Sequence, residues 1–261
     1  MLHKIIMDSI KEYNIDCSMV VRNLKTGEEA RINENRIMPA ASIIKIFVMG
    51  EIFSSINKGK LSLDDKIVIK EEEKTPYHLL TLFDPGRNFS VRELLKLMIC
   101  QSENTSTNVL IDMAGIDNIN AFIKSLGLRD CEIERKMSDM KARRQGKENY
   151  ISALEVSNFF ELLYNGKVIT EACSKQMIDI MKSQLLVADV HRYIPDDIGL
   201  ALKTGDIWGY KHAAGIFYID SCDYIFTMLI NYTDDKLIYA DEFMGKMSAA
   251  VYNYFNRNRN C

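Results

Sequence analysis

The sequence predicts an α+β fold in which both ends of the chain contribute strands to one antiparallel sheet. Alternating apolar and polar positions, which are typical of strands, occupy residues 16–33 and again residues 200–232. Between these regions the apolar positions recur at helical spacing. Because the two ends share the strand period, we expect an α/β sandwich lobe of residues 1–38 and 187–261. An all-α lobe of residues 39–186 is inserted into it, with a functional site between the two.

The sandwich lobe begins with a predicted helix over residues 2–13, whose isoleucines fall on one face. Strand-like residues 16–24 and 29–33 are joined by a turn at residues 25–28, which predicts a hairpin. At the other end of the chain, the predicted strands and the closing helix are residues 200–204, 212–219, 223–232 and 236–255.

The inserted lobe is predicted to be helical from about Ala41, where a long apolar run begins. Ser90 followed by Glu93 predicts a capping box, in which each side chain binds the backbone of the other residue at a helix start. Residues 129–150 are charged and poor in apolar side chains, which favours a long functional loop. The remaining predicted helices are residues 105–113, 152–164 and 171–186.

The composition is that of an ordinary globular protein. The chain has 261 residues, of which 47% are hydrophobic and 26% charged, enough for one large domain or two lobes. The net charge of −3 and the lack of a basic block argue against nucleic acid as a partner. Lys45 and Glu51 interrupt the longest apolar run, so we expect no membrane span.

Cysteines and histidines show no metal-ligand spacing, so we expect reduced thiols, no metal and no cofactor. The cysteines are Cys17, Cys100, Cys131, Cys173, Cys222 and Cys261. Residues 1–10 carry Asp8 and lack the apolar centre of a secretory signal. We therefore expect a cytoplasmic protein, or an exported one if a leader has been removed. We also expect a monomer.

The most informative stretch is Ser42-Ile43-Ile44-Lys45, in which a lysine follows a serine by three positions inside an apolar run. At helical spacing the two side chains share one face. Burial lowers the pKa of a lysine because the charged form loses solvation, so a neutral amine can deprotonate the serine. If Pro39 marks the helix start, Ser42 also lies near the positive end of the helix dipole.

Chance matches are the alternative interpretation. Ser55 and Ser138 begin two further S-x-x-K matches that we interpret as solvated surface, and Lys25 begins a K-T-G that fits a tight turn. A lysine inside an apolar run needs a partner, so its setting favours the match that contains Lys45.

Three further motifs follow along the chain. They are Ser102-Glu103-Asn104, Lys203-Thr204-Gly205, and Trp208-Gly209 with His212-Ala213-Ala214-Gly215.

Together with Ser42 and Lys45, the first two of these motifs resemble the S-x-x-K, S-D-N and K-T-G set of class A β-lactamases and penicillin-binding proteins. The order matches, and the first residues of the three motifs are separated by 60 and 101 positions, similar to class A enzymes. The resemblance covers nearly the whole chain. It implies the serine β-lactamase/transpeptidase-like fold.

The resemblance also implies roles for individual residues. Ser42 would attack an amide carbonyl to form an acyl-enzyme, Lys45 would be the base or a proton relay, and Ser102 would pass a proton to the leaving nitrogen. Backbone N–H groups of Ser42 and Asp206 would form the oxyanion hole. Asn104 would bind the side-chain amide of the substrate, and Lys203 and Thr204 would hold its carboxylate. Further implied substrate-binding residues are Gly205, Asp206 and Tyr77. For Tyr77, an aromatic side chain on a surface loop is an equally good interpretation.

Several positions depart from the family pattern. Glu103 replaces an aspartate, where it can still make structural hydrogen bonds. Residues 135–141 align with the loop that carries the deacylating glutamate of class A enzymes, but Met137 occupies the glutamate position. Asp206 and His212 also differ from common class A residues, which leaves the substrate preference open. One of the carboxylates Glu134, Asp139 and Glu148 could replace the glutamate. The alternative is that no residue replaces it.

We therefore expect a class A-like serine β-lactamase that opens the β-lactam amide through a Ser42 acyl-enzyme, with slow deacylation if no group replaces the glutamate. The expected partner is a small β-lactam or peptide-like substrate. A penicillin-binding D,D-peptidase or esterase, a non-hydrolytic β-lactam or acyl-binding sensor, and an inactive relative stay open as alternatives. Turnover separates the enzymes from the other two.

Overall fold

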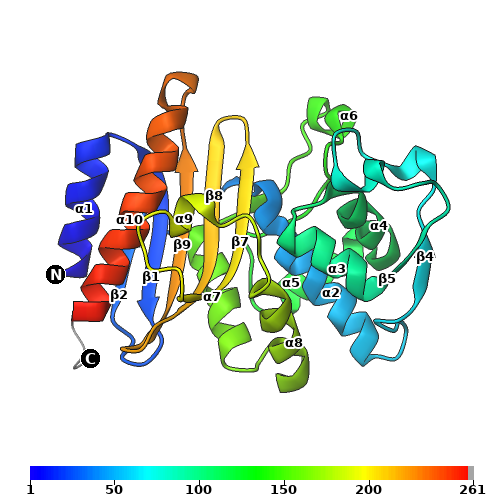
Figure 1. The fold of residues 1–261 in the computed structure, drawn as a ribbon, viewed down its shortest axis with the longest axis horizontal. Helices are drawn as coiled ribbons and strands as arrows, with labels where there is room; N and C mark the ends of the chain where they lie inside the picture. Colours follow the sequence, from blue (N-terminus) through cyan, green and yellow to red (C-terminus); the bar gives the residue numbers. More distant parts are fainter. Residues whose placement is uncertain (258–261) are drawn as a thin grey trace.

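The fold is built on a five-stranded antiparallel sheet with the strand order β2-β1-β9-β8-β7 (Figure 1). The computed structural model describes residues 1–257. The N-terminal hairpin pairs directly with the C-terminal strands, and Met19 of β1 lies opposite Met228 of β9. This confirms the predicted α+β class and the sheet assembled from both ends of the chain. The strands are β1 (Asp16–Asn23), β2 (Glu29–Ile32), β7 (Gly199–Ile207), β8 (Tyr210–Tyr218) and β9 (Asp223–Asn231).

Along β1, β7, β8 and β9, alternate side chains enter two different hydrophobic clusters. Met19 and Val21 pack in the cluster that includes α1 (Leu2–Tyr13) and α10 (Leu237–Arg257), whereas Val20 packs in the cluster on the opposite face. The two-residue period of a strand produces this division. In Figure 1, α1 and α10 lie side by side on one face of the sheet.

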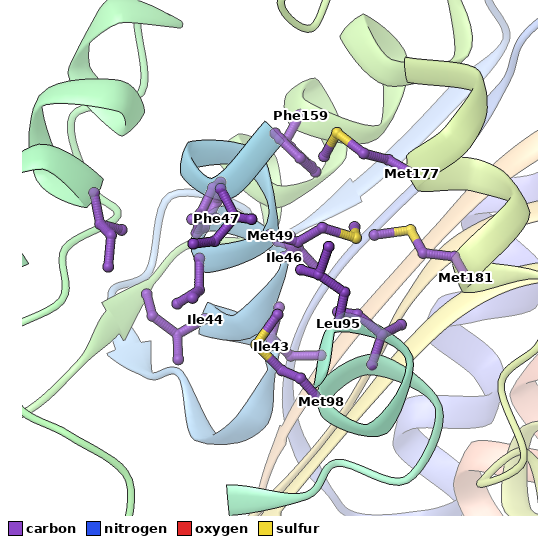
Figure 2. Close-up of a cluster of buried hydrophobic side chains, with 14 of the residues drawn as sticks. Ile43, Ile44, Ile46, Phe47, Met49, Leu95, Met98, Phe159, Met177 and Met181 are labelled. Carbon is purple, nitrogen blue, oxygen red and sulfur yellow. The ribbon is translucent and has the colours of Figure 1, made fainter. Parts of the chain in front are cut away.

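The opposite face of the sheet shares its core with the inserted helices. On this face α7 (Ala153–Tyr164) packs against β1, β8 and β9, and α8 (Glu171–Met181) packs against β7. The central helix α2 (Lys45–Asn57) is buried on all sides near its start, as its sequence predicted. Figure 2 shows its side chains among those of neighbouring helices. The ring centres of Phe47 and Phe159 are 5.1 Å apart.

The capping box at Ser90 is confirmed: the serine hydroxyl accepts a hydrogen bond from Glu93 N, and the Glu93 carboxylate accepts one from Ser90 N. The remaining elements are β3 (Met38–Pro39), η1 (Ala41–Ile44), β4 (Lys66–Val68), η2 (Glu71–Glu73), η3 (Leu79–Leu82), β5 (Asn88–Ser90), α3 (Val91–Cys100), α4 (Asn104–Ala114), α5 (Ile116–Ser125), α6 (Met140–Arg144), β6 (Tyr150–Ile151), α9 (Ala188–His191) and η4 (Asp234–Lys236).

The start of the central helix differs from the prediction. Pro39 does not begin the helix, because it pairs with Tyr150 in the short ladder between β3 and β6. Ala41 then adopts a φ of 47°, in the left-handed region, which prevents a continuous helix from forming there. Ser42 consequently lies in the 3₁₀ helix η1, one turn before α2 begins at Lys45.

The helix predicted to reach residue 186 ends at Met181. The side-chain oxygen of Gln184 accepts hydrogen bonds from Leu185 N and Leu186 N at 3.0 and 3.1 Å. These contacts satisfy backbone N–H groups outside the helix. The helix can therefore end at Met181 although the apolar sequence pattern continues.

The cysteines among residues 1–257 are all buried and form no disulfide with one another, while Cys261 lies outside the described residues. Within the same residues, no helix combines the length and apolar character that crossing a bilayer requires. The division of the chain into lobes at residues 38/39 and 186/187 stays a prediction.

His212 of β8 connects the sheet to β3. Its Nε2 lies 2.8 Å from the carbonyl oxygen of Pro39, so the neutral imidazole donates this nitrogen's proton to the segment that precedes Ser42. Complete burial lowers the pKa of His212 to about 4. The imidazole is therefore neutral at pH 7, and the hydrogen bond fixes its tautomer.

Gly215→Ala should lower the free energy of unfolding by about 1–3 kcal/mol, measured by urea denaturation. An added Cβ would lie 2.2 Å from Ala201 O and 2.8 Å from Leu202 Cα, and these backbone atoms of β7 can move away only with the strand. Gly199→Ala is the matched control, since its nearest neighbour, the Tyr218 side chain at 3.3 Å, is better able to shift. Equal losses in the two variants would contradict this explanation.

Stability should also depend on pH through His212. The unfolded side chain titrates near pH 6.5 and the folded one near 4, so the unfolded state binds more protons between these values. The stability from keeping His212 neutral is complete above pH 6.5 and is lost as the pH falls toward 4, a change of roughly 3 kcal/mol.

His212→Gln keeps an N–H donor but does not titrate in this range. Its free energy of unfolding should therefore fall less than that of the unaltered protein between pH 6.5 and 4, as measured by urea denaturation at both values. Parallel pH dependences of the two proteins would show that His212 does not contribute.

Candidate active site

The sequence motifs meet where β7, η1 and the connection between α3 and α4 approach one another. Ser42 lies in η1, Lys45 is the first residue of α2, Ser102 lies just before α4, and Lys203 is in β7. A Cβ on Gly205 would lie 3.0 Å from Ser42 N, so this glycine allows β7 to approach the backbone of the candidate nucleophile.

Lys45 is completely buried. Its Nζ donates hydrogen bonds to Ser102 O at 2.7 Å, Ser102 Oγ at 3.1 Å and Asn104 Oδ1 at 2.7 Å. Burial lowers the pKa of Lys45 well below its ordinary value, and the charge of Lys203 lowers it further, whereas Glu103 opposes the shift. A charged lysine has three N–H donors, and these contacts use them all. In the neutral form the amine has a lone pair that can accept a proton.

The Ser102 hydroxyl lies between two lysines. Its Oγ is 3.1 Å from Lys45 Nζ and 3.1 Å from Lys203 Nζ. Ser102 has a φ of 52°, and this left-handed turn is the point at which the chain passes from α3 to α4. Since a hydroxyl can accept one hydrogen bond while donating another, Ser102 can relay a proton between the lysines and a leaving group.

Lys203 is also completely buried, and burial lowers its pKa to about 7. Besides Ser102 Oγ, its Nζ contacts the carbonyl oxygen of Thr204 at 2.6 Å. A lysine with this pKa is partly cationic at neutral pH, and a bound substrate carboxylate would favour its charged form.

Glu103 has the structural role that the sequence allowed for it. Its carboxylate accepts a hydrogen bond from Ser106 N and caps the start of α4. Its backbone oxygen also accepts a hydrogen bond from Thr107 Oγ1 at 2.7 Å. The longer side chain therefore still fixes the helix that carries Asn104.

The other predicted site residues differ in how closely they join this group. Thr204 lies next to Lys203 in β7, and the Asp206 carboxylate contacts Lys211 Nζ at 3.4 Å. Tyr77 is fully exposed and has a φ of 64°. This exposure agrees with the surface-loop interpretation, and a role in lining the cleft stays a prediction.

The three carboxylates that could replace the deacylating glutamate have other partners. Glu148 is buried and forms ion pairs with Arg135 and Arg143, at 2.5 and 3.4 Å. The Glu134 side chain accepts a hydrogen bond from Glu148 N, and the Asp139 side chain caps α6. Each of these contacts helps to fix the course of the loop.

Met137 is buried, and its backbone is held by the side chain of Asn108. Met137 N donates to Asn108 Oδ1 at 2.8 Å, and Asn108 Nδ2 donates to Met137 O at 3.1 Å. This double hydrogen bond fixes the loop against α4 immediately before Ser138.

Sequence spacing did not reveal two residues that contact Asn104. Its Nδ2 lies 2.9 Å from His78 Nε2 and 3.2 Å from Ser138 Oγ. Ser138 is exposed, as expected, but it reaches the site group. His78 belongs to no motif, and only the folded loop before η3 brings it to α4. His212, in contrast, was visible in the sequence as the start of a motif.

Comparisons with known proteins agree with the motifs and the fold. The model of the Beta-lactamase enzyme family matches residues 1–255. β-Lactamase BRO-1 of Moraxella catarrhalis is 27% identical over 185 residues, which cover 69% of this chain and 58% of that protein.

Two solved structures show the same fold. The β-lactamase from Sphaerobacter thermophilus superposes with a TM-score of 0.88 at 24% identity, over 98% of this chain and 97% of that one. A PBP-A mutant, solved as an acyl-enzyme complex with penicillin G, superposes with a TM-score of 0.88 at 22% identity, over 98% and 96%.

The match of the family model extends over almost the whole chain and includes all three motifs. One lysine from each of the first and third motifs, Lys45 and Lys203, also contacts Ser102 of the second motif, in the fold that the solved β-lactamase and PBP-A share. This chain belongs to the β-lactamase enzyme family.

Proposed function

We propose that this protein is a class A-like serine β-lactamase that opens the β-lactam amide through an acyl-enzyme on Ser42. The observation that carries the proposal is the placement of Ser102 Oγ between Lys45 and Lys203, both buried, beside the turn that holds Ser42. This arrangement supplies a nucleophile, a neutral amine and a proton relay in one group.

In the proposed acylation, Ser42 Oγ forms a bond to the lactam carbonyl carbon while its proton moves to the neutral Lys45 amine. The C–N bond of the lactam then breaks, and Ser102 Oγ gives its proton to the leaving nitrogen. Lys45 in turn returns a proton to Ser102, which is 3.1 Å away. Backbone N–H groups of Ser42 and Asp206 stabilise the oxyanion, an effect of roughly 3–4 kcal/mol per donor.

Substrate orientation in this proposal comes from the β7 edge and Asn104. Lys203 holds the substrate carboxylate as a cation, and Thr204 donates a hydrogen bond to the same group. Asn104 binds the side-chain amide of the substrate, and its position is fixed by Lys45 at 2.7 Å.

The second candidate is a penicillin-binding D,D-peptidase or a non-hydrolytic sensor, in which the acyl-enzyme persists. The observation that favours it is the engagement of Glu134, Asp139 and Glu148 in structural contacts, with Met137 at the aligned glutamate position. A methionine cannot accept a proton from water. The lifetime of the adduct separates the two candidates.

Ser42→Ala should abolish both the covalent adduct with penicillin G and the loss of the antibiotic, because the attacking oxygen is removed. Intact-protein mass spectrometry and absorbance at matched times report the two quantities. Ser55→Ala is the control, since it removes the serine of another S-x-x-K match and should leave both unchanged. Antibiotic loss that continues in Ser42→Ala would contradict the proposal.

The second-order rate constant for acylation by penicillin G should fall as the pH rises above about 7, where Lys203 of the free protein loses its charge. It should also fall at any pH low enough to protonate Lys45, whose pKa burial lowers well below its ordinary value. p-Nitrophenyl acetate has no carboxylate for Lys203 to hold, so its acylation should lack the alkaline decrease. The same alkaline decrease with both compounds would argue against carboxylate recognition by Lys203.

A further inference from the structure

Met137 occupies the position of the glutamate that would activate the deacylating water. A basic side chain, that of His78, approaches the site from another direction. His78 lies in the segment between η2 and η3 and contacts Asn104 at the start of α4. Nothing in the acylation chemistry uses this histidine.

The hydrogen bonds determine which His78 nitrogen can act as a base. Lys45 Nζ donates a hydrogen bond to Asn104 Oδ1 at 2.7 Å, so the amide oxygen of Asn104 faces Lys45. The Asn104 amide nitrogen therefore faces His78 Nε2 at 2.9 Å. Because an amide nitrogen donates, Nε2 must be the acceptor and the ring proton is on Nδ1. A basic lone pair thus points into the group of site residues.

The segment that carries His78 is anchored. Thr75 is buried, and its backbone N–H donates to Thr105 Oγ1 of α4 at 2.9 Å. Thr81 Oγ1 donates to His78 O at 2.7 Å, and Leu80 is buried in the hydrophobic cluster that also contains the side chains of α2. These contacts hold the half-buried imidazole on the site side of the loop.

Partial burial favours the unprotonated form of the imidazole. Burial lowers the pKa of His78 below its ordinary value, Lys45 of α2 lowers it further, and Glu103 at the start of α4 opposes the shift. The loop after α5 contributes an uncharged group here, the Ser138 hydroxyl, which shares the Asn104 amide. At pH 7 the side chain is neutral and can accept a proton.

We propose that His78 is the general base of deacylation, replacing the loop glutamate. The proposal rests on the Ser42 acyl-enzyme described above. When the side-chain amide of a substrate takes the hydrogen bond of Asn104 Nδ2, the His78 lone pair becomes available to a water molecule.

In the hydrolytic step, water oxygen forms a bond to the acyl carbonyl carbon and gives one proton to His78 Nε2. The bond between that carbon and Ser42 Oγ then breaks, and the imidazolium gives its proton to the departing Ser42 Oγ. The products are the ring-opened acid and the free serine, so His78 returns to its neutral state.

His78→Gln keeps an oxygen that can accept from Asn104 but removes the basic nitrogen. We expect the rate constant for deacylation of the penicillin G adduct to fall about 100-fold or more, with acylation changed by less than about threefold. Rapid-quench mass spectrometry measures both steps. His3→Gln, the same substitution in α1, is the matched control and should change neither rate constant.

Deacylation of His78→Gln at the unaltered rate would overturn the role of His78 and leave the Ser42 proposal intact. A missing adduct together with undiminished penicillin G in the unaltered protein would overturn both. The pH profile of deacylation in the unaltered protein is a test that needs no variant. Its rate constant should fall about tenfold per pH unit below the His78 pKa. A rate constant that stays unchanged down to the lowest pH at which the protein remains folded would overturn the proposal.

Discussion

The burial of one lysine is the constraint on which the site depends. Lys45 begins the central helix α2, where neighbouring side chains are apolar, and a cation there is unstable without compensating contacts. The contacts come from Ser102 and Asn104, which belong to a different segment of the chain. Satisfying Lys45 therefore forces the α3–α4 connection against the start of α2, and the proposed catalytic group forms as a consequence.

The same lysine links the two proposed halves of the reaction. Through Ser102 it is connected to Lys203 and the substrate carboxylate, and through Asn104 it is connected to His78. Lys45 fixes the orientation of the Asn104 amide, and that amide fixes the tautomer of His78. The proposed acylation and deacylation groups consequently depend on one network of hydrogen bonds rather than on separate sites.

The position of the nucleophile is set by backbone packing rather than by a helix start. His212 binds Pro39, and the left-handed Ala41 turns the chain into η1, where Gly205 allows β7 to approach Ser42 closely. Sequence periodicity predicted a helix through this region because its side chains are apolar on every side. Periodicity carries no information about the backbone dihedral angle of Ala41. Its left-handed φ replaces the predicted continuous helix with the short helix η1.

The sequence alone determined the sheet built from both ends of the chain, the buried central helix and the three motifs, because hydrophobic period and short local patterns encode them. The sequence also showed that Met137 occupies the position that aligns with the deacylating glutamate. Only the tertiary structure decided the partners of Glu134, Asp139 and Glu148 and placed His78 beside Asn104. The reason is physical: these contacts join segments far apart in the chain through single side-chain atoms, and neither spacing nor periodicity carries information about such distances.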